Sequence, residues 1–207
     1  MIQEICAIID RSGSMRGKEE DTIGGINTFI DELKKNKESN EKIYLTIKLF
    51  DHEDIIFIQN KKINDVEYLN LTNLVPRGQT ALLDSMGKTL SHYIERKKMD
   101  SSSFDSCIIY IATDGYENSS KIYNNDSIKT LIKQAEILNI KLLYLAANQD
   151  AILESSKFGL DSTQAINYSE RSDTTENVYR SVASVAKRAR SGHSVSFLQA
   201  ERTASQY

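Results

Sequence analysis

Short runs of apolar residues, separated by polar turns, predict the strands of this chain. These runs have lengths that are typical of strands and too short for most helices. The clear runs lie at 5–9, 43–50, 55–58, 107–113 and 141–147, and a weaker one lies at 163–167. Only four residues, 51–54, separate the second run from the third, which permits only an antiparallel hairpin. The third run is therefore predicted to be an edge strand, with Lys61 and Lys62 at its end.

Helical spacing of apolar residues fills most of the chain between these runs. Apolar residues recur every three or four positions over 18–36, 80–98 and 126–138. We expect the second of these helices to begin at Thr80 and the third to be capped by Asp126. A last helix is predicted from an N-cap at Asp173 to a basic final turn before Gly192. Strands that alternate with helices after one early hairpin predict an α/β fold, a doubly wound, mainly parallel six-stranded sheet with one antiparallel edge strand and helices on both faces.

The polar residues that follow the first apolar run are candidates for binding a metal ion. Asp10 ends the run, and Ser12 and Ser14 follow at alternate positions, so a solvent-reachable loop can present three oxygens to one point. Carboxylate and hydroxyl oxygens, with no His or Cys beside them, suit a hard divalent cation. A Ser/Gly turn that only caps the following helix is the alternative interpretation.

Two later positions add oxygen atoms to this set. Thr80 follows a Gly-containing turn, and Asp114 ends the strand predicted at 107–113. In doubly wound sheets, ligands bind at the carboxyl ends of the strands, where Asp10 and Asp114 are both expected. The pattern resembles the metal-ion-dependent adhesion site of the von Willebrand factor A (vWA, integrin I-like) family, in the same order and at similar spacings. The matching positions are Asp10, Ser12, Ser14, Thr80 and Asp114.

This resemblance implies a fold, a ligand and a use. It implies one Rossmann-like vWA domain over residues 1–191, followed by a polar tail, 192–207, outside the family pattern. It implies that the five matching residues hold Mg²⁺, with Mn²⁺ or Ca²⁺ as alternatives, and that an acidic residue of a partner protein completes the metal shell. On this interpretation the chain is an intracellular adaptor or scaffold module and not an enzyme, so no residue is assigned a catalytic role.

Overall composition narrows the class of partner. The chain has 207 residues and a formal net charge of −3, which gives no electrostatic case for binding nucleic acid. Its apolar runs are far shorter than the ~20 residues that span a bilayer, and its N-terminus lacks a basic leader region. We therefore expect a cytoplasmic protein that does not associate with membranes. Cys6 and Cys107 lie on strands that are neighbours in the family fold, and we expect both to be free, buried thiols.

A metal-dependent hydrolase or phosphatase that uses Asp10 and Asp114 is the alternative function. A phosphatase with an aspartyl nucleophile at Asp10 would normally have a second carboxylate two residues on, where this chain has Ser12. A serine hydrolase needs a base near its nucleophile, and the three histidines are scattered without such a spacing. A dinucleotide-binding function is a third possibility, but no G-x-G-x-x-G loop follows the first strand.

Residues near the candidate site carry weaker predictions. We expect Arg11 to be a solvated loop residue and Asp84 to orient the Thr80 segment without binding metal. Glu117-Asn118 either hydrogen-bonds the loop of Asp114 or belongs to a polar turn. The pair Gly24-Gly25 costs helix stability, and we expect it to let the backbone approach a neighbouring strand closely.

Overall fold

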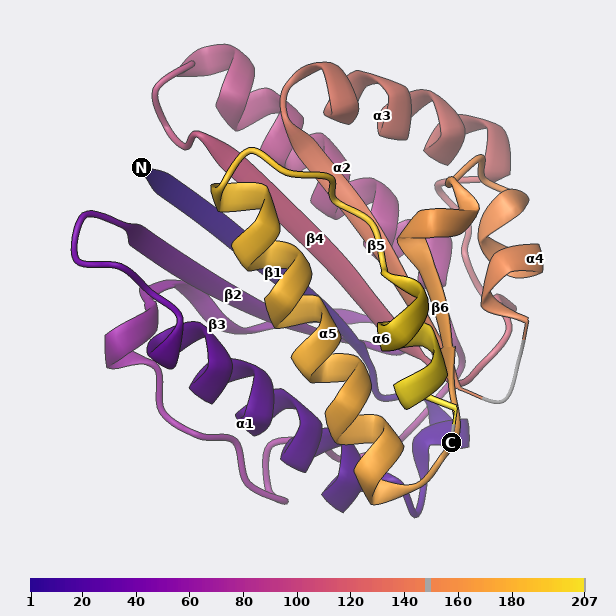
Figure 1. Cartoon of the computed structure of the whole chain (residues 1–207). Helices are drawn as coiled ribbons and strands as arrows, with labels where there is room; N and C mark the ends of the chain where they lie inside the picture. The colour runs from indigo at the N-terminus through magenta and orange to yellow at the C-terminus, as the bar shows by residue number, and fades with distance from the viewer. Residues whose placement is uncertain (148–149, 207) are drawn as a thin grey trace.

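The computed structural model describes residues 1–147 and 150–206, and its centre is one six-stranded sheet (Figure 1). The strands are β1 (Ile2–Asp10), β2 (Lys42–Phe50), β3 (Asp54–Lys62), β4 (Ser106–Thr113), β5 (Ile140–Ala147) and β6 (Ala165–Tyr168). The helices are α1 (Glu19–Lys35), α2 (Leu82–Met99), α3 (Asn125–Ile137), α4 (Ala151–Ser156), α5 (Ser172–Arg190) and α6 (Gln199–Ala204).

The order of the strands confirms the predicted doubly wound sheet. Across the sheet the order is β3-β2-β1-β4-β5-β6, and every neighbouring pair is parallel except β2 and β3. The antiparallel hairpin therefore ends in an edge strand, as predicted. After β3 the chain crosses back to the other side of β1, so the winding reverses between β1 and β4. The carboxyl ends of these two strands form the crevice where such sheets bind ligands.

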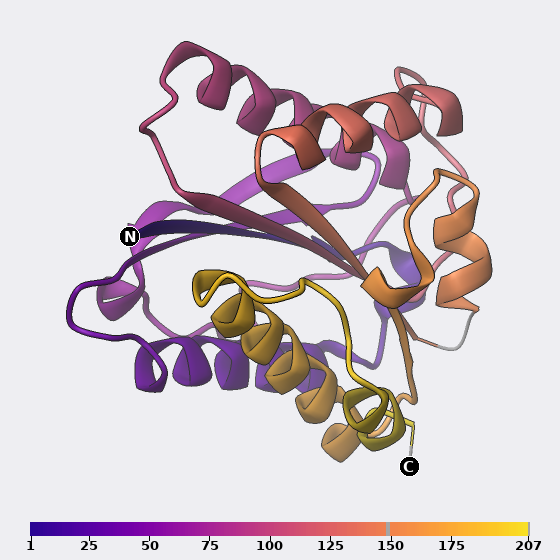
Figure 2. The same ribbon diagram turned by 45° about the horizontal axis from the view of Figure 1, so that its top comes forward.

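The sheet separates two apolar cores, one on each face. In Figure 2 it lies between α2 and α3 on one side and α1 and α5 on the other. On β1, Ile5, Ala7 and Ile9 belong to the core beneath α1 and α5, whereas Cys6 and Ile8 belong to the core beneath α2 and α3. A strand that is buried on both faces is apolar along most of its length, which is why Ile5 to Ile9 is a continuous apolar run.

The starts of three helices differ from the predictions. Helix α2 begins at Leu82, so Thr80 lies in the preceding connection. Helix α3 is capped by Asn124, whose side chain accepts a hydrogen bond from the Ser127 backbone N–H at 2.9 Å. Asp126 and Asp173 were therefore wrongly predicted to be caps. Both instead lie in the first turn of their helices, where a negative charge still interacts favourably with the helix dipole.

Gly25 serves a contact between helices, and not the predicted contact with a strand. A Cβ atom at Gly25 would lie 2.3 Å from a ring carbon of Tyr179 on α5, whereas a Cβ atom at Gly24 would meet nothing within 4 Å. Of these two glycines, only Gly25 is therefore needed for the close approach of α1 and α5.

The polar tail folds back onto the domain. Phe197 is buried and its backbone N–H donates to the Thr163 carbonyl at 2.8 Å. Arg188 of α5 pairs with Glu201 of α6 at 2.7 Å. The predicted boundary at residue 191 thus precedes a segment that packs against α5. Among the described residues, no helix is long and apolar enough to cross a bilayer, and Cys6 and Cys107 are both buried and free.

Candidate metal centre

Asp10 lies at the reversal of the winding, as the last residue of β1. Its Oδ1 accepts a hydrogen bond from the Ser12 backbone N–H at 2.6 Å, and its Oδ2 accepts one from Thr113 Oγ1 at 2.6 Å. The residue is 0% exposed, so the expectation that it lies on a solvent-reachable loop was wrong. The strands on either side, β2 and β4, extend as far as β1 does and flank its backbone at this point.

Burial also changes the acidity of Asp10. Desolvation raises the pKa of its carboxyl from 3.8 to about 6, although hydrogen bonds from Thr113 and Ser12 act in the opposite direction. The negative charge of Asp114 raises this pKa further. A carboxylate that is buried and close to a second carboxylate gains stability from any cation placed between them.

The three hydroxyl residues complete a cluster of oxygens. Ser12 Oγ and Ser14 Oγ lie 3.0 Å apart, and Ser14 Oγ donates to Asp114 Oδ1 at 2.6 Å. Thr80 joins them from the connection before α2. The structure therefore brings together all five residues that the sequence pattern selected, from three separate segments of the chain.

Gly115 leaves a hollow at the centre of this cluster. A Cβ atom at position 115 would lie 3.0 Å from Ser14 Oγ, 3.2 Å from Thr80 Oγ1 and 3.6 Å from Asp10 Oδ2. Any side chain at this position would fill the space on which the three oxygens converge. The donor set consists of oxygens alone, so the hollow and its lining fit a hard divalent cation such as Mg²⁺.

Backbone hydrogen bonds hold the three segments in place. The Gly13 N–H donates to the Gly78 carbonyl at 3.2 Å and joins the first segment to the second. The Thr80 N–H donates to Asn118 Oδ1 at 2.9 Å, and the Asn118 N–H returns a bond to the Thr80 carbonyl at 3.1 Å. Asn118 thus fixes Thr80 relative to the segment that carries Asp114.

Asp84 organises the site without facing it. Its carboxylate accepts hydrogen bonds from the backbone N–H groups of Lys121, Ile122 and Tyr123 at 2.9, 2.9 and 2.8 Å. Burial acts to raise the pKa of Asp84, but these three bonds outweigh it and lower the pKa. Asp84 therefore ties the start of α2, which begins two residues after Thr80, to the loop after Asp114.

Lys18 and Glu170 are neighbours of the site that the sequence analysis missed. Lys18 Nζ forms ion pairs with Asp114 Oδ2 and Glu170 Oε1, and the Asp114 side chain is only 1% exposed. Burial acts to lower the pKa of Lys18, but its bonds to Asp114 and Glu170 outweigh this and raise it. All three residues line a small pocket of about 230 Å³. No local pattern marks this trio, because its members are far apart in the sequence.

A second acidic group, outside the oxygen cluster, forms ion pairs with arginines. Asp51, His52 and Glu53 are close enough to share a metal ion, and among the described residues they are the only group of three His, Cys, Asp or Glu side chains that are. However, Asp51 Oδ2 lies 3.1 Å from Arg11 Nε and 2.9 Å from Arg77 Nε. Two guanidinium groups already balance this charge, so Asp51 acts as an anchor for the loops. Arg11 is only 8% exposed, and the prediction that it is solvated was wrong.

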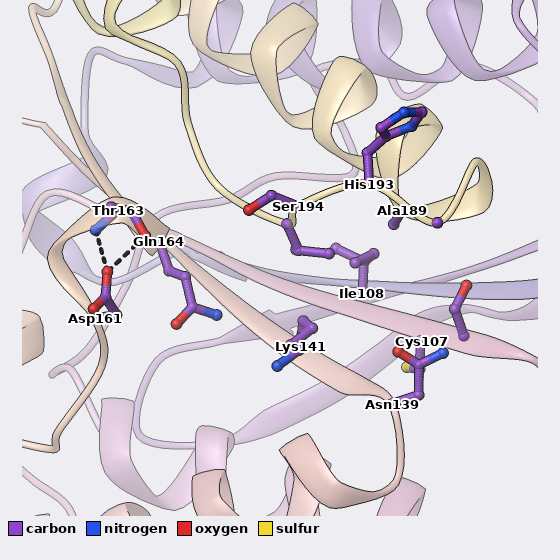
Figure 3. Close-up of a pocket in the computed structure, with 13 residues that line it drawn as sticks. Cys107, Ile108, Asn139, Lys141, Asp161, Thr163, Gln164, Ala189, His193 and Ser194 are labelled. Carbon is purple, nitrogen blue, oxygen red and sulfur yellow. Dashed lines mark hydrogen bonds between the residues drawn. The ribbon is translucent and has the colours of Figure 1, made fainter.

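Larger pockets lie away from these oxygens. One of about 430 Å³ lies at the opposite ends of β4 and β5, where Cys107, Asn139 and Lys141 lie across from His193 on the segment after α5 (Figure 3). A metal ion needs converging donors and little volume, so the size of a pocket is no guide to the metal centre here.

The chain is similar in fold to solved structures that include vWA domains. The chain is similar to a von Willebrand factor type A protein from Catenulispora acidiphila, with a TM-score of 0.61 and 17% identity over 89% of this chain and 42% of that one. It is similar to the vWF domain of the type V pili tip protein Mfa5 from Porphyromonas gingivalis, with a TM-score of 0.61 and 11% identity over 96% and 98% of the two chains. It is also similar to proximal thread matrix protein 1 from the mussel byssus, solved with a zinc-occupied MIDAS motif, with a TM-score of 0.59 and 14% identity over 89% and 46%.

These likenesses establish the fold. No family model and no curated protein matches the chain. The chain spans less than half the length of the Catenulispora and mussel proteins, and nearly all of the Mfa5 domain. With its strand order and its single antiparallel edge strand, the chain has the Rossmann-like fold of the von Willebrand factor A domains, as the sequence resemblance predicted.

Proposed function

We propose that this chain is a metal-ion-dependent protein-binding module in which Asp10, Ser12, Ser14, Thr80 and Asp114 hold one divalent cation. The observation that carries the proposal is the convergence of their oxygens on the hollow at Gly115. Two carboxylates and three neutral hydroxyls suit Mg²⁺, with Mn²⁺ or Ca²⁺ as alternatives. The zinc in the mussel protein supports metal binding at this position of the fold.

The partner is a protein that presents an Asp or Glu side chain. Asp10 and Ser12 are buried, whereas Ser14 is exposed, so the cluster opens to solvent on one side. The two carboxylates formally balance a divalent cation, but the other three ligands are neutral hydroxyls, so the cation keeps Lewis acidity and a free coordination position toward that side. A carboxylate from outside the chain is a hard oxygen ligand that can fill this position.

The two cysteines support a cytoplasmic location for this module. Cys6 and Cys107 are buried without a disulfide, as is usual for thiols in a reducing compartment. An adaptor role inside the cell is consistent with that environment.

We propose no catalysis at the site. Ser12 stands where an aspartyl phosphatase would have a second carboxylate, and Ser14 Oγ contacts both Ser12 Oγ and Asp114 Oδ1. His52 lies beside Gly78, and its Nδ1 atom is 3.3 Å from Asp51 Oδ1. The alternative is a metal-dependent hydrolase or phosphatase that uses the same two carboxylates.

Metal titration and capture together test the proposal. Calorimetry with Mn²⁺ and Mg²⁺ is expected to find one site, which Asp10→Asn removes and Asp126→Asn, the same change on an exposed residue, retains. Immobilised protein is expected to retain partners from a native lysate with Mg²⁺ but not with chelator. No heat at millimolar metal, or the same partners in chelator, would overturn the proposal. Mg²⁺-dependent hydrolysis of p-nitrophenyl phosphate that Asp10→Asn abolishes would support the alternative.

A further inference from the structure

Lys18 occupies a position that its helix does not favour. It is the N-cap residue of α1, and its side chain makes no capping hydrogen bond. Ser, Thr, Asp and Asn are preferred there because they accept a bond from a free backbone N–H, and a positive charge faces the positive end of the helix dipole. The next residues, Glu19, Glu20 and Asp21, follow these rules. The reason for a lysine at position 18 must therefore lie outside α1.

Its ammonium group lies between two carboxylates of other segments. Nζ contacts Asp114 Oδ2, after β4, and Glu170 Oε1, in the connection from β6 to α5. The other oxygen of Asp114, Oδ1, accepts the hydrogen bond from Ser14. Asp114 thus faces the hydroxyls of the candidate metal centre with one oxygen and Lys18 with the other.

The three charged side chains of this group are buried to different depths. Asp114 is nearly fully buried, with its side chain 1% exposed, whereas the side chains of Lys18 and Glu170 are 26% and 27% exposed. A buried carboxylate needs a counter-charge, and Lys18 is the cation that the structure places on Asp114. A divalent cation in the hollow would also draw on the charge of Asp114, and it would repel the ammonium.

We propose that Lys18 is an internal counter-ion of the candidate metal centre, which balances Asp114 when no metal is bound and competes with a divalent cation for that carboxylate. Glu170 gives Lys18 a second partner, so the ammonium stays paired when Asp114 is engaged by metal. Lys18 thereby limits the affinity of the site and keeps metal binding reversible. This inference rests on the proposed function, because it concerns the same five ligands.

Variants that remove or keep the positive charge at position 18 test the inference. Lys18→Met removes the ammonium and keeps the length of the side chain, Lys18→Arg keeps the charge, and Lys35→Met makes the same change in the last turn of α1. Free Mn²⁺ in titrations is followed by electron paramagnetic resonance. Lys18→Met is expected to bind Mn²⁺ at least about tenfold more tightly than the wild type, a change of about 1.4 kcal/mol. Lys18→Arg and Lys35→Met are expected to stay within about twofold.

Thermal unfolding separates this role from a purely structural one. In chelator, Lys18→Met is expected to lower the Tm, because Asp114 then lies buried without its counter-charge. Added Mn²⁺ is expected to raise the Tm of Lys18→Met by more than that of the wild type. Lys18→Gln, which keeps a hydrogen-bond donor for Asp114, replaces Lys18→Met if that variant does not fold.

These measurements distinguish a failure of the counter-ion role from a failure of the proposed function. If the wild type binds Mn²⁺ and Lys18→Met binds it equally or more weakly, the counter-ion role is overturned and the metal centre is left in place. The absence of Mn²⁺ binding in the wild type and in every variant would overturn the proposed function itself, and with it this inference. Binding by Lys18→Met alone would support the counter-ion role but would overturn a metal-dependent function of the wild-type chain.

Discussion

Thr113 Oγ1 donates a hydrogen bond to Asp10 Oδ2 at 2.6 Å and joins the carboxyl ends of β1 and β4. The parallel register, with Ile9 opposite Ala112, brings the two residues together at the point where the winding of the sheet reverses. This bond favours the charged form of Asp10, yet burial outweighs it and the pKa remains raised to about 6. Asp10 is therefore held in position for a cation at some cost to the metal-free fold.

Metal affinity is expected to fall as the pH drops through about 6. Asp10 must be ionised to bind a cation, and its pKa is raised from 3.8 to about 6 by burial. Below that pH, protons compete with metal, and each further unit costs about tenfold in affinity from this group. Mn²⁺ titrations between pH 5 and pH 8 check this. An affinity that stays constant across this range would show that Asp10 does not titrate in competition with the metal.

Asp10→Asn is expected to stabilise the metal-free protein at pH 7.5 by about 1–3 kcal/mol. An acid whose pKa is higher in the folded state than in the unfolded state destabilises the fold above both values, and the penalty fades as the pH falls from about 6 toward 3.8. The gain is therefore smaller at pH 5 than at pH 7.5. Urea unfolding in chelator measures both, with Asp126→Asn as the control. A loss of stability at pH 7.5 would contradict this account of Asp10.

Gly115→Ala is expected to weaken Mn²⁺ binding by at least about tenfold, about 1.4 kcal/mol, without any change of charge. The added methyl group would lie 3.0 Å from Ser14 Oγ and 3.2 Å from Thr80 Oγ1, in the hollow assigned to the cation. Calorimetry measures the affinity, and urea unfolding in chelator shows whether the metal-free fold is retained. Unchanged affinity in a folded variant would place the cation elsewhere.

The two adjacent glycines of α1 are expected to respond to alanine in opposite directions. Gly24→Ala meets nothing within 4 Å, so it is expected to raise the free energy of unfolding by about 0.5–1 kcal/mol through helix propensity. Gly25→Ala places a methyl group 2.3 Å from the Tyr179 ring and is expected to lower it by about 1–3 kcal/mol through overpacking. Urea unfolding of the pair, each variant serving as the control for the other, measures both values. Equal effects would show that α1 and α5 move apart without cost.

The sequence by itself determined the fold class and the composition of the candidate site. Apolar runs such as Ile5 to Ile9 are strongly constrained because the interior of a strand that is buried on both faces is mostly apolar, so they are visible without any structure. Asp10 and Asp114 were placed correctly because each directly follows such a run, and the carboxyl ends of parallel strands meet at one edge of the sheet. Ser12 and Ser14 lie too close to Asp10 in the sequence to be far from it in space.

Only the tertiary structure decided how these groups are neutralised and how deeply they are buried. The pairing of Lys18 with Asp114 and Glu170 joins three distant segments, and the pairing of Asp51 with Arg11 joins two. Ion pairs of this kind leave no periodic trace in a sequence, because their geometry depends on how the packed elements meet. For the same reason the burial of Asp10, and hence its raised pKa, depends on how the segments around the end of β1 pack together, which the local sequence does not show.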